Sequence, residues 1–186
     1  MRRIVSILML AALLCGCGVH HKELDRAMAL RAKVLTSAGC SLDAEITANY
    51  ADRVYTFLMH CVCDGKGKLD FTVLEPESIS GITGSVSDDG GKLTFDDQAL
   101  AFELLADGQV SPVSAGWLLM KALRGGYIRS CGKKGDKLSL QIDDSYADDA
   151  LHLEILLGEN DLPEFAEILY KDRRFLSFHI RNFQIL

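Results

Sequence analysis

The residues best suited to metal chemistry are His60, Cys61 and Cys63, which stand close together in the sequence. Imidazole nitrogen and cysteine sulfur are ligands that zinc prefers, and a structural zinc site needs four of them. The segment alternates like a β-strand, so His60 points to the opposite face from Cys61 and Cys63. No second Cys or His pair at zinc spacing supplies the missing ligands. The sequence therefore predicts no metal site and predicts that these cysteines are small buried apolar residues.

Other motifs for catalysis or cofactor binding are incomplete. The acidic run Asp143–Asp149 lacks the Gly and the terminal Glu of an EF-hand loop and is interpreted as a solvated loop. Gly81–Gly91 contains no Gly-Lys-Ser/Thr and precedes no helix, so it is not a phosphate loop. Neither Gly-x-Ser-x-Gly nor His-Glu-x-x-His occurs. We therefore predict no catalytic residue, no cofactor and a non-enzymatic protein, with a hydrolase of unrecognised site as an alternative.

The N-terminus has the pattern of an export signal. Arg2 and Arg3 precede the apolar run Ile4–Leu14, as in a secretory signal peptide. The following Leu14-Cys15-Gly16-Cys17 resembles the bacterial lipobox, in which the last cysteine becomes the new N-terminus and receives diacylglycerol on its sulfur. We predict removal of residues 1–16 and acylation of Cys17, palmitate being one such acyl group. The alternative is an ordinary signal peptide or an uncleaved anchor helix.

The net charge and the cysteines limit which kinds of partner and disulfide the sequence predicts. Removing Arg2 and Arg3 lowers the 20 Lys and Arg to 18 against 26 Asp and Glu, a formal charge of −8. This acidity predicts no nucleic-acid partner and no broad basic face on anionic lipid. Attachment to the extracytoplasmic face of the membrane would come from the acyl chains. In an exported protein Cys40 and Cys131 could form a disulfide, but the sequence does not decide it.

Two helices are expected. Lys22–Ser37, which follows the short tether 17–21, has one apolar stripe, and we expect Arg31 within that stripe to extend outward along its stem. Ser111–Gly126 is apolar on nearly every side and too short to span a bilayer, so we interpret it as a plug buried in a concave sheet. Ser111 is its expected N-cap, and Gly125 is expected to end it with a positive φ angle.

The rest of the chain predicts short strands. Ser41–Tyr50 alternates apolar and polar residues, whereas Arg53–Asp64 is apolar on both faces and needs cover. The segments expected as strands are 41–50, 53–64, 68–74, 79–86, 92–95, 99–105, 127–131, 137–142, 151–157, 164–170 and 174–186. The fold class is therefore α+β, mainly antiparallel β, with about ten to eleven strands. We expect a single domain over residues 22–186.

This order of elements resembles the lipoprotein-carrier superfamily with the LolA/LolB-like fold. The resemblance rests on Leu24–Leu35, the Tyr55–Leu74 hairpin, the Gly81–Gly84 crossing, Ser111–Gly126 and the closing Phe178–Phe183 strand. It implies an incomplete (half) β-barrel around an apolar cavity for acyl chains. The residues that would line this cavity are Trp117, Leu118, Met120, Tyr55, Phe57 and Met59.

Two features depart from the family pattern. Cys17 would anchor this chain, whereas the soluble periplasmic carrier has no anchor. The hairpin loop Asp64–Lys68 lacks the protruding apolar residue of the outer-membrane acceptor. Lipid-anchored GerS-like germination lipoproteins of spore-forming bacteria are a nearer analogue. The leading hypothesis is a membrane-anchored module that binds a lipid or acyl chain. The alternative is a partner or regulator of a cell-envelope enzyme, such as a spore cortex amidase.

Overall fold

The computed structural model describes residues 20–50, 53–96, 98–102, 105–106, 109–148, 150–171 and 173–186. The predicted signal peptide, Cys17 and the first residues of the tether lie outside the described residues. Within the described ranges, no helix combines the length and the apolar character needed to cross a bilayer.

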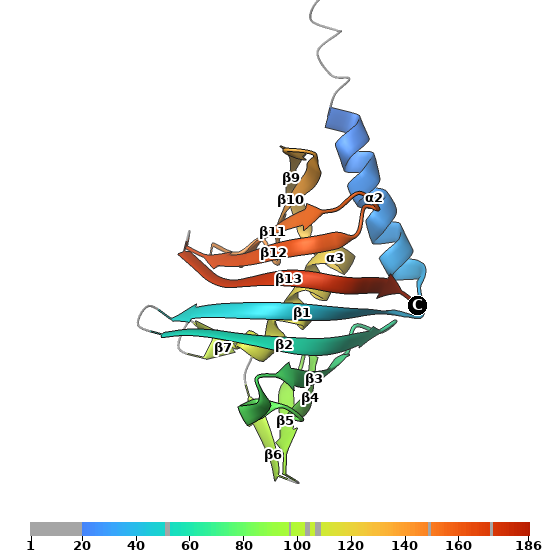
Figure 1. Cartoon of the computed structure of the whole chain (residues 1–186). Helices are drawn as coiled ribbons and strands as arrows, with labels where there is room; N and C mark the ends of the chain where they lie inside the picture. The colour runs from blue at the N-terminus through green and yellow to red at the C-terminus, as the bar shows by residue number, and fades with distance from the viewer. Residues whose placement is uncertain are drawn as a thin grey trace, which may run out of the picture.

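Eleven strands form one continuous antiparallel sheet in the order β6-β5-β4-β3-β2-β1-β13-β12-β11-β10-β9 (Figure 1). Their bounds are β1 Gly39–Tyr50, β2 Arg53–Asp64, β3 Leu69–Glu75, β4 Thr83–Ser87, β5 Gly90–Phe95, β6 Gln98–Phe102, β9 Tyr127–Lys134, β10 Lys137–Asp143, β11 His152–Leu157, β12 Pro163–Tyr170 and β13 Arg173–Ile185. The end strands β6 and β9 do not pair with each other, so the sheet stays open. With two α-helices, α2 His20–Thr36 and α3 Ala115–Gly125, this confirms the predicted mainly antiparallel half-barrel.

Two segments predicted as single strands are divided. Residues 79–86 contain the end of a 3₁₀ turn, η2 Glu77–Ile79, and only then enter β4. Gly81 between them has φ +86°, a conformation that residues with a Cβ rarely adopt. Residues 99–105 run from β6 into β7 Leu105–Ala106, which pairs with β8 Gln109–Val110 in a separate two-stranded sheet.

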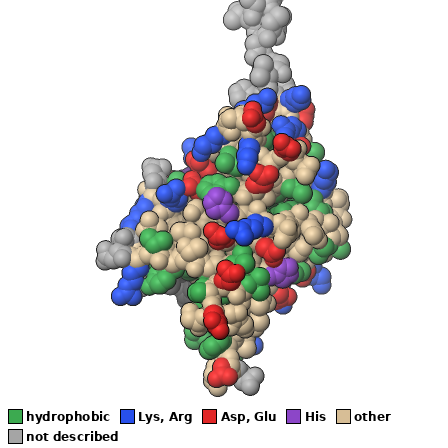
Figure 2. Space-filling model, in the orientation of Figure 1, with side chains coloured by type: hydrophobic (Ala, Val, Ile, Leu, Met, Phe, Trp, Pro, Cys, Tyr) green, Lys and Arg blue, Asp and Glu red, His purple; other side chains and the backbone are tan. Residues whose placement is uncertain are grey.

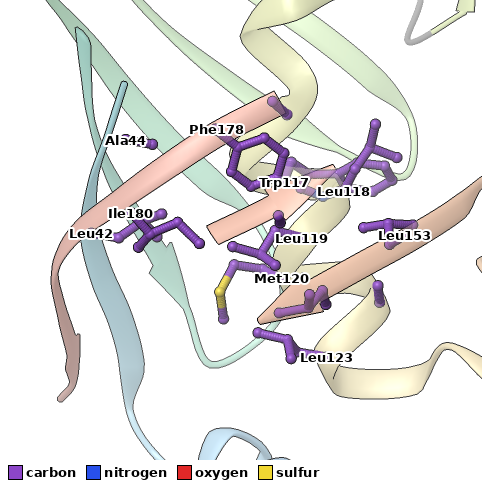
Figure 3. Packing of buried hydrophobic residues seen from close by; sticks show 14 of the residues in the cluster. Leu42, Ala44, Trp117, Leu118, Leu119, Met120, Leu123, Leu153, Phe178 and Ile180 are labelled. Carbon is purple, nitrogen blue, oxygen red and sulfur yellow. The ribbon is translucent and has the colours of Figure 1, made fainter. Parts of the chain in front are cut away.

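The core fills the concave side of the sheet. On β1, every second residue from Cys40 to Ala48 is fully buried, and directly opposite residues such as Met59 and Phe178 share this face. The buried side chains of α3 face Phe178 and Leu153 across this space (Figure 3). The convex side, which Figure 2 views with α3 behind the sheet, intersperses acidic and basic side chains and carries no broad region of one sign.

The plug helix begins and ends differently from the prediction. Pro112–Ser114 (η3) forms a 3₁₀ turn before α3, and the Ser111 side chain caps neither. The backbone N–H of Ser114 donates to the Ser111 carbonyl instead, at 3.0 Å. Gly125 does not have a positive φ angle, so that prediction was wrong. The helix ends because Gly126 turns to extended backbone, φ −64° and ψ 157°.

Glycine is required at Gly126 by close packing. A Cβ there would stand 2.4 Å from Ile142 Cγ2 and 2.9 Å from the Ala122 carbonyl oxygen, whereas a Cβ on Gly125 meets nothing within 4 Å. We expect Gly126→Ala to lower the free energy of unfolding by about 1–3 kcal/mol, as overpacking does. Gly125→Ala should leave it unchanged or raise it by up to about 1 kcal/mol. Urea denaturation of both variants tests this, and a larger loss for Gly125→Ala would contradict it.

Arg31 joins the two helices. Its Nε donates to the Leu123 carbonyl at 2.8 Å, and its Nη2 donates to Gly126 at 2.7 Å and to Ala122 at 3.2 Å. The side chain therefore turns inward and binds the carbonyls at the end of α3, which corrects the prediction that it extends outward. Partial burial lowers the pKa of its guanidinium below the usual value.

Candidate functional site

One half of the concave face is filled by the plug. Trp117 on α3 is 3% exposed, and its indole Nε1 donates to the Gly67 carbonyl at 3.1 Å. Arg124 donates to the Gly65 carbonyl at 2.6 Å. The loop between β2 and β3 is therefore bound to α3, and it presents no protruding apolar residue.

Five of the six predicted lining residues come together in this half. Trp117, Leu118, Met120, Phe57 and Met59 are all buried in one hydrophobic cluster. Tyr55, on the same face of β2 as Phe57, is 47% exposed near the start of the strand, where its ring centroid is 6.4 Å from that of Tyr50. Tyr55 therefore lies at the exposed edge of the buried group, and the role of the six residues in ligand binding stays a prediction.

The other half of the concave face is open and apolar. Phe71, Gly84, Leu93 and Leu100 lie directly opposite one another across β3 to β6, so Leu93 and Leu100 share the concave face of buried Phe71. Leu100 is 65% exposed. Phe95, which is also exposed, and half-buried Phe102 lie on the same face. We call the four residues Leu93, Phe95, Leu100 and Phe102 the wing patch.

The wing patch was missed by sequence reasoning, although a signal existed. Leu93 and Phe95 alternate with Lys92 and Thr94, which marks one apolar face of a strand. Leu100 and Phe102 repeat the pattern on the next strand. Alternation alone does not tell whether such a face is covered by other elements, so the exposure required the tertiary structure.

The convex face carries hollows whose walls mix polar and apolar side chains. One of about 420 Å³ is lined by His60, Thr72 and Thr83, among others, and a larger one of about 1010 Å³ includes Phe165 and His179. His60 Nδ1 lies 2.7 Å from Asp43 Oδ1. Hydrogen bonds from Asn182 first, and from His60 next, hold the pKa of the Asp43 carboxyl below its usual value. These are solvated side-chain pairs, and no group of three potential metal ligands occurs among the described residues.

The four cysteines within the described ranges are free thiols. Cys40, Cys61 and Cys63 are buried and Cys131 is half-buried. The possible Cys40–Cys131 disulfide is therefore absent. Cys40 on β1 lies opposite Cys63 on β2, and Cys131 is on β9 at the far edge of the sheet. Burial raises the pKa of Cys61 to about 12 and of Cys63 to about 11, so neither supplies a thiolate nucleophile at neutral pH.

Sequence comparisons identify no relative: no family model matches the chain, and no curated protein matches it. Similar solved structures include a LolA superfamily protein from Nitrosomonas europaea, with a TM-score of 0.46, 10% identity and coverage of 86% of this chain and 93% of that one. The lipoprotein LppX of Mycobacterium tuberculosis gives a TM-score of 0.41 at 9% identity, covering 87% of this chain and 93% of that one.

The MucA/MucB complex of Pseudomonas aeruginosa gives a TM-score of 0.39 at 13% identity, covering 86% of this chain and 56% of that one. The structures similar to this chain thus include a member of the superfamily that its sequence resembles. At these identities the similarity concerns the course of the chain and not its ligands. The GerS-like branch stays a prediction.

Proposed function

We propose that this chain is an exported, non-enzymatic lipoprotein that holds an apolar ligand, a lipid or an acyl chain, against the concave face of its half-barrel. The observation that carries the proposal is the wing patch. Leu100 and Phe95 expose 65% and 48% of their surface on a face whose other half is the hydrophobic core. Exposed apolar side chains gathered on a concave face are typical of binding sites.

The wing patch continues into the core without a polar break. Cys61, Phe71, Gly84, Leu93 and Leu100 form one row across β2 to β6. An ideal Cβ on Gly116 of α3 would stand 3.0 Å from Cys61 Sγ and 3.4 Å from Leu69 Cδ1, so α3 rests directly on the inner end of this surface. An acyl chain lying along the row would therefore reach the side of the plug. We propose Phe57, Met59, Trp117, Leu118 and Met120 as the inner wall of the site and Tyr55 as a residue at its rim.

Removing one apolar side chain from the wing patch tests this. Leu100→Ser should weaken the binding of a long-chain fatty acid by about 10- to 100-fold, because burying a leucine is worth about 1.5–3 kcal/mol. Saturable change in Trp117 emission reports binding. Val54→Ser is the matched control, since Val54 is 62% exposed but on the convex face of β2. Equal affinity of the two variants, or no saturable change in the unaltered protein, would contradict the proposed site.

A second candidate function has its own support. Five predicted lining residues are buried in the hydrophobic cluster of the plug half, so the exposed wing patch could instead dock a protein. In this reading the chain regulates a cell-envelope enzyme, for example a spore cortex amidase during germination. Native mass spectrometry of the purified protein separates the two. Co-purified lipid that Leu100→Ser removes supports the carrier, and a lipid-free protein that captures one envelope enzyme through Leu100 supports the regulator.

The membrane anchor is tested at the predicted lipobox. Cys17→Ser should move the protein from the detergent-extracted membrane fraction to the soluble fraction, because the thioether to diacylglycerol requires the thiol. Cys15→Ser should leave the protein in the membrane fraction. Equal retention of both variants would contradict acylation of Cys17.

A further inference from the structure

Helix α2 has a second apolar face that the fold does not use. Ala27, Leu30 and Val34 are at most 3% exposed and pack into the core. Leu24, Met28 and Leu35 are 40%, 47% and 49% exposed. These three follow one another at i, i+4 and i+11, which is one line along about three helical turns. We call these three residues the α2 stripe.

The α2 stripe itself consists of apolar side chains, and exposed Asp25 flanks it beside Leu24 and Met28. Helical spacing places Arg31 between Met28 and Leu35 on this line. Its guanidinium, however, is bound to the carbonyls of Leu123, Ala122 and Gly126 at the end of α3. Arg26 pairs with Asp161 in the turn between β11 and β12, on another side of the helix. The exposed side chains of the α2 stripe are therefore apolar, and the guanidinium of Arg31 does not lie among them. Such a helix face is more stable in an apolar medium than in water.

The position of the α2 stripe in the chain identifies that medium. Helix α2 begins at His20, three residues after Cys17. Three extended residues span at most about 10–11 Å. An acylated Cys17 would therefore keep the first turn of α2 close to the leaflet that holds the acyl chains, and Leu24 could reach its headgroup region if the helix lies along the surface. A partner protein would have to enter this narrow space.

We propose that α2 lies on the membrane surface with Leu24, Met28 and Leu35 immersed in the headgroup region. This rests on the proposed acylation of Cys17 and adds an orientation to it. Figure 1 places β5 and β6 at the opposite end of the molecule from the start of α2. The acyl chains and the helix together would restrict tumbling of the domain, with the wing patch at the end of the molecule remote from the start of α2.

The test uses the acylated full chain on vesicles of phosphatidylethanolamine and phosphatidylglycerol. Met28→Cys carries an NBD fluorophore, and Lys33→Cys, on the exposed polar side of α2, is the matched control. The unaltered protein gives the background from Cys131. NBD at residue 28 should shift to the blue and react with dithionite roughly tenfold more slowly than at residue 33, because interfacial helices bury their apolar face about 5–10 Å deep.

The outcomes separate orientation from anchoring. Equal dithionite rates at residues 28 and 33 on vesicles would overturn the orientation. Protection of residue 28 in the Cys17→Ser variant, free of acyl chains, detergent and vesicles, would also overturn it, because the α2 stripe would then be covered by protein. Vesicle retention of Cys17→Ser at the level of the unaltered protein would instead contradict the anchor, while NBD at residue 28 still reports independently on the helix.

Discussion

Replacing Trp117 with alanine is expected to lower the free energy of unfolding by about 3–5 kcal/mol, the usual cost of truncating a buried aromatic residue. Trp117 is 3% exposed in the first turn of α3 and belongs to the same buried cluster as Phe178 (Figure 3). The substitution also removes the hydrogen bond from Nε1 to the Gly67 carbonyl. It therefore weakens both the packing of α3 and its connection to the β2–β3 loop.

Urea denaturation followed by far-ultraviolet circular dichroism measures this loss without the tryptophan signal. Tyr55→Ala is the control, because Tyr55 is 47% exposed and should cost much less. A loss of stability below about 1 kcal/mol for Trp117→Ala would mean that the plug half already contains space. The cost of truncating a buried side chain depends on how tightly its surroundings are packed. That result would favour a deep ligand cavity beneath α3 over a filled core with binding confined to the wing patch.

Arg31→Met is expected to lower the free energy of unfolding by about 2–4 kcal/mol. A hydrogen bond to a charged group is worth about 1.5–3 kcal/mol, and the three bonds of Arg31 contribute less than their sum because one guanidinium makes them all. Methionine keeps the length and apolar stem of the side chain. It removes the Arg31 donors from the Leu123, Gly126 and Ala122 carbonyls, of which Ala122 still accepts from the Gly126 N–H at 2.9 Å. The lost positive charge also stood at the negative end of the α3 dipole.

Lys33→Met is the matched control, because Lys33 is exposed on the same helix and should change stability by less than about 0.5 kcal/mol. Hydrogen exchange adds a local readout: the last turn of α3 should exchange faster in Arg31→Met and remain unchanged in Lys33→Met. Equal unfolding midpoints for the two variants would show that water satisfies these carbonyls as well as Arg31 does.

The fold was largely predictable because period-2 alternation is a local property. The segments 41–50 and 53–64 were predicted almost to their ends. The expectation that 53–64 is covered on both faces was wrong, because Val54 and Val62 are exposed on the convex face of β2. The plug was predictable for the same reason: an almost wholly apolar helix has to be buried wherever it lies. The prediction that His60 points away from Cys61 and Cys63 likewise rested on strand periodicity, and β2 exposes His60 while it buries both cysteines.

Contacts between distant segments were not predictable in this way. Arg31 was expected in solvent because its own helix does not show that the carbonyl end of α3 lies 92 positions away in sequence but 2.8 Å away in space. Glycine is required at Gly126 because Ile142 on β10 lies against it, and no such neighbour lies against Gly125. Cys40 and Cys131 were compatible with a disulfide until the strand order separated them.

By itself, then, the sequence determined the repeating features of the protein: which faces of each strand and helix are apolar, and where the plug lies in the chain. The export signal and its lipobox stay predictions. Only the tertiary structure decided which apolar faces are covered. It buries Trp117 and Met120, and it leaves Leu100 on the wing and Met28 on α2 exposed, although all four are apolar residues in regular elements. The physical reason is that apolar character depends on one residue, whereas burial depends on how many neighbours the whole fold brings to it.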